Sequence, residues 1–108
     1  MSFYVIQPYI MKVSDEELKK INQCKINNNW SLAETIRNNL LIGGVMENRD
    51  GLLDNLTILT RSETRIYNHQ VKFEYSIEME NRIKYFQEKT GAYKTSIIRN
   101  FLKNAKLI

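Results

Sequence analysis

An internal repeat limits the folds open to this chain more than any other feature. The strings AETIRN, starting at Ala33, and TSIIRN, starting at Thr95, share Ile-Arg-Asn and lie 62 positions apart in a chain of 108 residues. We call this spacing the repeat offset. Outside these strings, few residues are identical between positions separated by the repeat offset. Both copies nevertheless carry the same order of structural signals. A self-similarity of this kind predicts two equivalent structural units within one chain.

The second copy carries the clearer signals. Residues 70–75 alternate polar and apolar side chains, which predicts a strand with one apolar face. Residues 76–89 begin with a serine suited to capping and continue with apolar residues spaced by four and three, the pattern of one helix face. Gly91 ends this helix, because glycine readily adopts the left-handed conformation just past a helix end. A second helix is expected from about 93–95 onward.

The first copy repeats this order. Alternation over 9–13 predicts a strand, with the preceding proline at its start or edge. Ser14 is followed by three acidic residues, a typical helix start. Asn29 stands where the second copy has glycine, and asparagine also tolerates positive φ. The sequence of 31–34, Ser-Leu-Ala-Glu, is a capping box that starts the next helix, and the glycines at 43–44 close it.

The two copies are joined by residues 45–69. Four leucines in this segment fit one helical stripe, at positions 52, 53, 56 and 59. Two interpretations are open: a short helix packed on the core, or a mobile linker. Proline and glycine are too scarce here for a low-complexity spacer.

A strand with two helices cannot bury its apolar face alone, and it leaves its backbone unpaired. Two such units solve both problems when their strands pair antiparallel and one face of the ribbon lies on the four helices. We therefore expect a single domain over 1–108, mainly α with a two-stranded antiparallel β-ribbon. In it, a first unit (9–44) and a second unit (70–106) form an intramolecular pseudo-dimer.

Composition excludes several classes of function. Cys24 is the single cysteine and His69 the single histidine, so neither an intramolecular disulfide nor a dedicated His/Cys zinc site is available. We interpret Cys24 as a small core residue, and no pair of carboxylates is placed for acid–base work. No metal, cofactor or catalytic residue is predicted, and the protein is not expected to be an enzyme. The apolar runs are too short to cross a bilayer and no secretory signal is apparent, so we expect a soluble, cytoplasmic protein without a membrane partner.

Charge is unevenly distributed along the chain. The formal net charge is +4, with residues 1–54 carrying six basic and seven acidic side chains and residues 55–108 carrying ten and five. A basic half permits a polyanionic partner but does not establish one.

The stretches YIMKVSDEELKKINQCKINNNWSLAETIRNNLL and VKFEYSIEMENRIKYFQEKTGAYKTSIIRNFLKN together resemble the ribbon-helix-helix family of DNA-binding proteins, of the Arc, MetJ and CopG type. They cover about two-thirds of the chain. The chain departs from the family pattern at Tyr93, where a capping serine or threonine is common, and at Asn29, where glycine is usual. The resemblance implies a ribbon that enters the major groove of duplex DNA while the start of each second helix holds the DNA backbone.

The resemblance also implies which residues touch DNA. The base-contacting residues would be Ile10, Lys12, Gln70, Lys72 and Glu74. The phosphate-contacting residues would be Ser31, Leu32 and Ala33, with Tyr93, Lys94 and Thr95. Lysine can donate to guanine, glutamine can pair with adenine, glutamate can accept from cytosine and isoleucine can contact a thymine methyl. Because the two strands differ, we expect an asymmetric or imperfectly palindromic pair of half-sites.

A structural interpretation of the same residues stays open, since polar side chains on one face of a strand are commonly only solvated. Arg37 and Arg99, at matched places on the second helices, are expected to form structural salt bridges to Glu34 or other neighbours rather than base contacts. Trp30 is expected to pack in the turn between helices.

The resemblance favours a small transcriptional repressor, which acts as a monomer with internal pseudo-twofold symmetry and places one or several copies on a DNA site. An accessory factor that marks a plasmid transfer origin or partition site is a close alternative. From another class, a protein-interaction module such as an antitoxin would expose the leucine stripe of 45–69 to a partner.

Overall fold

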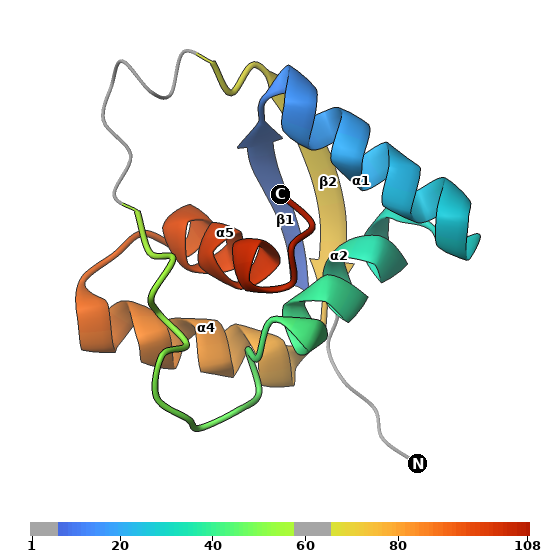
Figure 1. Ribbon diagram of the computed structural model, residues 1–108. Helices are drawn as coiled ribbons and strands as arrows, with labels where there is room; N and C mark the ends of the chain where they lie inside the picture. The colour runs from blue at the N-terminus through green and yellow to red at the C-terminus, as the bar shows by residue number, and fades with distance from the viewer. Residues whose placement is uncertain (1–6, 58–65) are drawn as a thin grey trace.

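Two strands from distant parts of the chain pair to form the centre of the molecule (Figure 1). The structure is a computed structural model that describes residues 7–57 and 66–108. Strand β1 (Gln7–Val13) runs antiparallel to strand β2 (His69–Tyr75), and the register places Ile10 opposite Lys72 at the middle of the pairing. The two-stranded antiparallel sheet predicted from the alternating residues is confirmed.

Each strand leads into two helices, and the described residues contain four helices in all. The helices are α1 (Asp15–Asn28), α2 (Leu32–Ile42), α4 (Ile77–Thr90) and α5 (Lys94–Asn104). Every bound of β1, α1 and α2 recurs at the repeat offset in β2, α4 and α5. The predicted order of strand, helix, turn and helix therefore occurs twice, with elements of matching length.

Local sequence explains where the helices begin and end. Ser14 and Ser31 each complete a capping box, and the Ser76 hydroxyl accepts from the backbone of Met79. Each such cap contributes about 0.5–2 kcal/mol of stability. The first helix of each half ends in the left-handed conformation, at Asn29 (φ 55°) and Gly91 (φ 75°). The expectation that asparagine replaces glycine here is confirmed.

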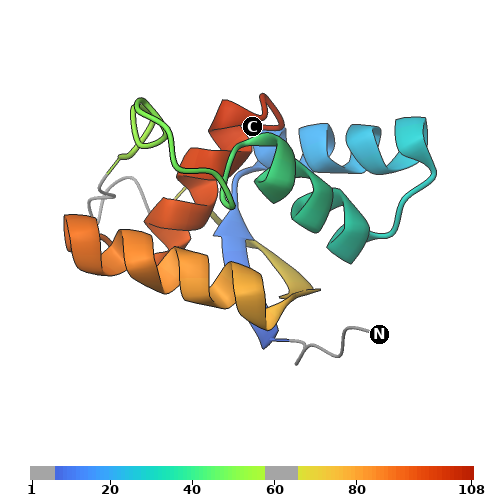
Figure 2. The ribbon, with the colours of Figure 1, turned by 90° about the horizontal axis from the view of Figure 1, so that it is seen from below.

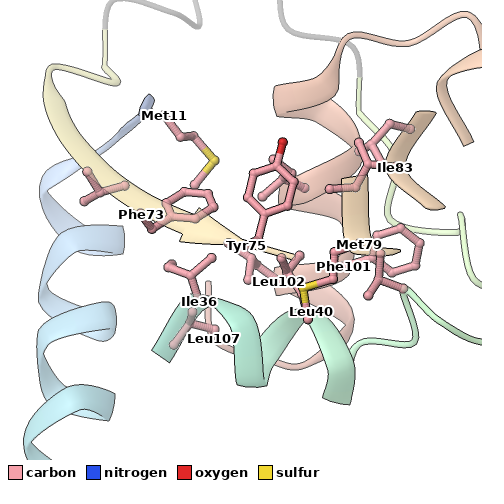
Figure 3. Close-up of a cluster of buried hydrophobic side chains, with 14 of the residues drawn as sticks. Met11, Ile36, Leu40, Phe73, Tyr75, Met79, Ile83, Phe101, Leu102 and Leu107 are labelled. Atoms are coloured by element: carbon pink, nitrogen blue, oxygen red, sulfur yellow. The ribbon is translucent and has the colours of Figure 1, made fainter. Parts of the chain in front are cut away.

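The core lies between one face of the ribbon and the helices. Alternate ribbon side chains point inward and are buried, namely Met11, Val13, Val71, Phe73 and Tyr75. In Figure 2, α2 and α5 lie on the same side of the two strands. Side chains from all these elements meet in one cluster, in which Ile36, Leu40, Ile83, Phe101 and Leu102 are fully buried (Figure 3).

The segment after α2 is fastened to the core by side chains that bond its backbone carbonyls. The amide of Asn100 donates to the Leu52 carbonyl at 2.6 Å, and Arg82 Nε donates to the Val45 carbonyl at 2.9 Å. Asn104 bridges the carbonyls of Gly43 and Leu52 at 3.1 and 2.8 Å. Hydrogen bonds to its backbone carbonyls therefore hold this segment in place on the helices.

The described part of this segment agrees with packing on the core, and the interpretation of 45–69 as a whole stays a prediction. Residues 45–57 form turns and no helix, and they pack on the molecule rather than form a free linker. Leu52 is 4% exposed, while Leu53 and Leu56 are half-buried against the core. The stripe therefore covers the core over these three positions, and Leu59 lies outside the described residues.

Among the helices that the structure describes, none has the length and apolar character needed to cross a membrane.

Candidate nucleic-acid interface

The ribbon face turned away from the helices gathers the five residues expected to contact bases. Three cross-strand pairs form this face, and we call them together the outward ribbon face: Pro8 with Glu74, Ile10 with Lys72, and Lys12 with Gln70. All six side chains are exposed. Ile10 is 54% exposed although it is a large apolar residue in the middle of a strand. Its exposure alone does not indicate a partner, because isolated apolar side chains are normal on protein surfaces.

Two arginines brace the ribbon from its helix side. Arg37 Nη1 donates to the Glu74 carbonyl at 3.1 Å, and Arg99 Nη1 donates to the Lys12 carbonyl at 2.9 Å. Donors and acceptors are both related by the repeat offset. Each second helix thus holds the strand of the other half, near opposite ends of the outward ribbon face.

The structural role expected for the two arginines is confirmed for Arg99, whereas Arg37 bonds a different partner from the expected one. Arg99 forms an ion pair with Glu17, which agrees with a structural salt bridge. Arg37 donates to the backbone of Glu74 rather than to the expected Glu34. The Glu34 carboxylate instead takes part in the capping box with Ser31. The hydrogen bond from the Ser31 backbone N–H is the main cause that lowers the pKa of this carboxyl, and the Ser31 hydroxyl is the second.

The two helix starts expected to bind phosphate are built differently. At α2, the capping box engages the N–H groups of Ser31 and Glu34 but not those of Leu32 and Ala33, and it holds the Glu34 carboxylate, which would repel a phosphate, at the helix end. At α5, Tyr93 is 79% exposed and its side chain makes no capping hydrogen bond. The hydroxyl of Thr95 is hydrogen-bonded to that of Tyr9 on β1. Free N–H groups at a helix start attract anions, so the α5 start is the better placed of the two for a phosphate.

Lys94 belongs to a largely buried polar cluster rather than to open solvent. Its Nζ lies 2.8 Å from both carboxylate oxygens of Glu80, and the Tyr75 hydroxyl donates to Glu80 Oε1 at 2.6 Å. Burial would raise the pKa of Glu80, but the hydrogen bonds from Lys94 and Tyr75 and the lysine charge outweigh it, so the pKa is lowered. Burial, followed by the bond to Glu80, raises the pKa of Tyr75. The positive charge expected to grip phosphate is therefore largely balanced within the protein.

This cluster was missed from the sequence, although the repeat carries a signal of it. The positions that precede Tyr75, Glu80 and Lys94 by the repeat offset are Val13, Leu18 and Leu32. In the first half these three residues are buried or packed against the core. A position that is apolar in one copy and charged in the other indicates a polar group inside the fold, provided that the copies are compared position by position.

We expect Glu80→Gln to lower the free energy of unfolding by about 1.5–3 kcal/mol at pH 7, because it removes the charge that binds Lys94. The folded-state pKa of Glu80 is lowered from 4.5. Its contribution is therefore complete above pH 4.5 and is lost as the pH falls through the folded-state pKa. Urea unfolding should show the difference between wild type and variant shrinking at acid pH.

The matched control is Glu88→Gln, which changes an exposed glutamate on the same helix and should leave stability unchanged within about 0.5 kcal/mol. If Glu80→Gln lowered the free energy of unfolding by the same amount at pH 7 and at pH 3, this would contradict the ionic role of Glu80.

A scan of protein-family models and searches of curated proteins and of solved structures find no match to this chain. Within residues 7–57 and 66–108, no three His, Cys, Asp or Glu side chains are grouped so that they could hold a metal ion. Cys24 is half-buried against the core, as expected for a packing residue. The outward ribbon face brings together the five predicted base-contacting residues, while the predicted phosphate-contacting residues lie at the starts of α2 and α5.

Proposed function

We propose that this protein binds duplex DNA sequence-specifically by placing the outward ribbon face in the major groove. One observation carries the proposal: the five residues expected to read bases lie exposed together on one face of a ribbon whose other face is buried. The major groove is about 12 Å wide and accepts a two-stranded ribbon, and each base pair shows a distinct donor–acceptor pattern there. Lys12, Lys72, Gln70 and Glu74 offer the matching donors and acceptors.

We further propose that the chain is a tandem ribbon-helix-helix protein, which acts as a pseudo-dimer within one molecule. The recurrence of every element at the repeat offset supports this arrangement. The equivalent bonds of Arg37 and Arg99 to the opposite strands support it as well. Both halves contribute to one core, so a second chain is not needed to complete it, and a monomer is the expected form in solution.

The biological use that fits best is a small repressor that acts by occupying an operator. A factor that marks a transfer origin or a partition site needs the same sequence-specific binding, so the genomic position of the bound site would distinguish the two. No catalytic step, metal or cofactor is part of this proposal. The interaction-module alternative loses support because Leu52, Leu53 and Leu56 pack on the core.

We expect Lys12→Ala/Lys72→Ala to abolish recognition of the cognate site while leaving weak binding to random DNA. Each lost base contact costs about 1–3 kcal/mol of discrimination, so the loss of two should lower affinity for the cognate site by about 30-fold or more. The measurement is a titration of the full chain with the sequence enriched from random or genomic fragments, after light scattering has established the molar mass.

Lys19→Ala/Lys20→Ala is the matched control, because it removes two exposed lysines from α1. Its affinity for the cognate site should stay within a few-fold of that of wild type, as for positions that contact neither bases nor phosphates. If the full chain enriches no sequence, or if both double variants lose affinity equally, the proposed function is wrong.

A further inference from the structure

The two ends of the outward ribbon face present opposite chemistry. One end carries Lys12 beside Gln70, a cation and an amide donor. The other carries Glu74 beside Pro8, an anion and a ring without an N–H. A symmetric ribbon would show the same side chains at both ends, since Lys12 and Glu74 are related by the repeat offset. The charge is therefore inverted between equivalent positions.

The backbone beneath these side chains does not share this asymmetry. Arg99 bonds the carbonyl of Lys12 and Arg37 bonds the carbonyl of Glu74, at 2.9 and 3.1 Å. Both ends of the ribbon are thus braced alike by a second helix, and both can present side chains to a groove. The difference between the ends lies in the chemistry of the outward side chains.

We infer that the protein binds its DNA site in a single orientation, with guanine or adenine acceptors under the Lys12 end and a cytosine amino group under the Glu74 end. This inference rests on the proposed function and adds the polarity of the site. Neighbouring pairs on one face lie about 7 Å apart, so the three pairs extend over about 14 Å. That length faces about four base pairs at a spacing of about 3.4 Å.

Charge and hydrogen bonding both favour one orientation of the protein on its site over the other. Lysine donates to the O6 and N7 acceptors of guanine and glutamine pairs with adenine, whereas glutamate accepts from the cytosine amino group. In the reversed orientation the Glu74 carboxylate would meet purine acceptors, so two acceptors would be desolvated without a donor. Ile10 and Lys72, opposite each other at the centre and related by the repeat offset, exchange places in the reversed orientation.

Two other titratable groups border the face at the Lys12 end. His69, opposite Val13 in the last pair of the ribbon, is bonded to the carboxylate of Asp15. The Asp15 carboxylate is therefore engaged beside the groove-facing side chains. Lys12 remains the exposed cation of this end.

The test uses two tethers at equivalent exposed positions. Glu16→Cys and Glu78→Cys, each with Cys24→Ser, place a thiol on the first turns of α1 and α4, next to opposite ends of the ribbon. Each thiol carries an iron–EDTA group, and cleavage is mapped on the enriched DNA site. We expect each tether to cut one side of the site at least about fivefold more than the other, on opposite sides for the two variants.

The exchange Lys12→Glu/Glu74→Lys should move the cuts of each tether to the opposite side. Equal cutting on both sides by each tether, or cutting that stays on its original side after the exchange, would overturn the single orientation. Failure of the proposed function looks different, because then wild type enriches no sequence and no tether produces a defined cut.

Discussion

Arg99→Leu should lower the free energy of unfolding by about 3–5 kcal/mol, the usual cost of removing one partner of a buried ion pair. The Arg99 side chain is 4% exposed, and the side chain of Glu17, whose carboxylate it binds, is 13% exposed. Its guanidinium also lies 4.0 Å from the centre of the Tyr67 ring and donates to the carbonyl of Lys12. The variant leaves an acid and a carbonyl inside the fold without their donor. Urea or thermal unfolding measures the loss.

The repeat provides the control for this prediction. Arg37→Leu removes the equivalent residue, which is half-buried and donates to the Glu74 carbonyl without a buried ion pair. It should cost about 1 kcal/mol or less. Adding Glu17→Gln to Arg99→Leu should recover part of the stability, because it removes the uncompensated charge and keeps an acceptor for the Ser14 cap. Equal losses for the two arginine variants would contradict the buried ion pair.

The elements of the fold could be predicted because their signals are local and periodic. Alternation over 70–75 indicates a strand whose odd positions are buried, and the structure buries those positions. The Ser31–Glu34 capping box starts α2 as the sequence indicates. The side chains of the outward ribbon face follow from the same alternation, since the residues between buried strand positions must point away from the core.

The contacts that hold these elements together were less accessible from sequence. Arg37, Asn100 and Arg82 bond backbone carbonyls, and a carbonyl is present at every residue, so the acceptor leaves no trace in the sequence. The leucines near 52 are spaced like one face of a helix, but the segment that carries them forms turns. Side chains of α4 and α5 bond the backbone of this segment and so keep the leucines against the core. The polar cluster at Glu80 leaves its trace only in the difference between equivalent positions of the two halves, such as Leu18 and Glu80.

Gly43→Ala should destabilise the fold by about 3 kcal/mol, at the upper end of the cost of overpacking. Gly43 follows α2 with φ −72° and ψ −10°, a conformation that alanine adopts without strain. The obstacle is contact, because an added Cβ would lie 2.0 Å from the carbonyl oxygen of Phe101. That oxygen belongs to the backbone of α5 and accepts from the N–H of Ala105. A backbone in a helix cannot rotate away as a side chain does, so α5 itself has to shift.

The control is Gly91, where an added side chain has free space but the backbone conformation is left-handed. Gly91 has φ 75° and nothing within 4 Å of an added Cβ, and its equivalent, Asn29, already adopts φ 55°. Gly91→Asn should therefore cost less than about 1 kcal/mol, because asparagine tolerates the left-handed region. Because α5 also carries Arg99 to the ribbon, the proposed function implies that any Gly43→Ala protein that stays folded binds DNA less tightly than Gly91→Asn does. Equal stability of the two variants would show that α2 and α5 do not cross as closely as Gly43 requires.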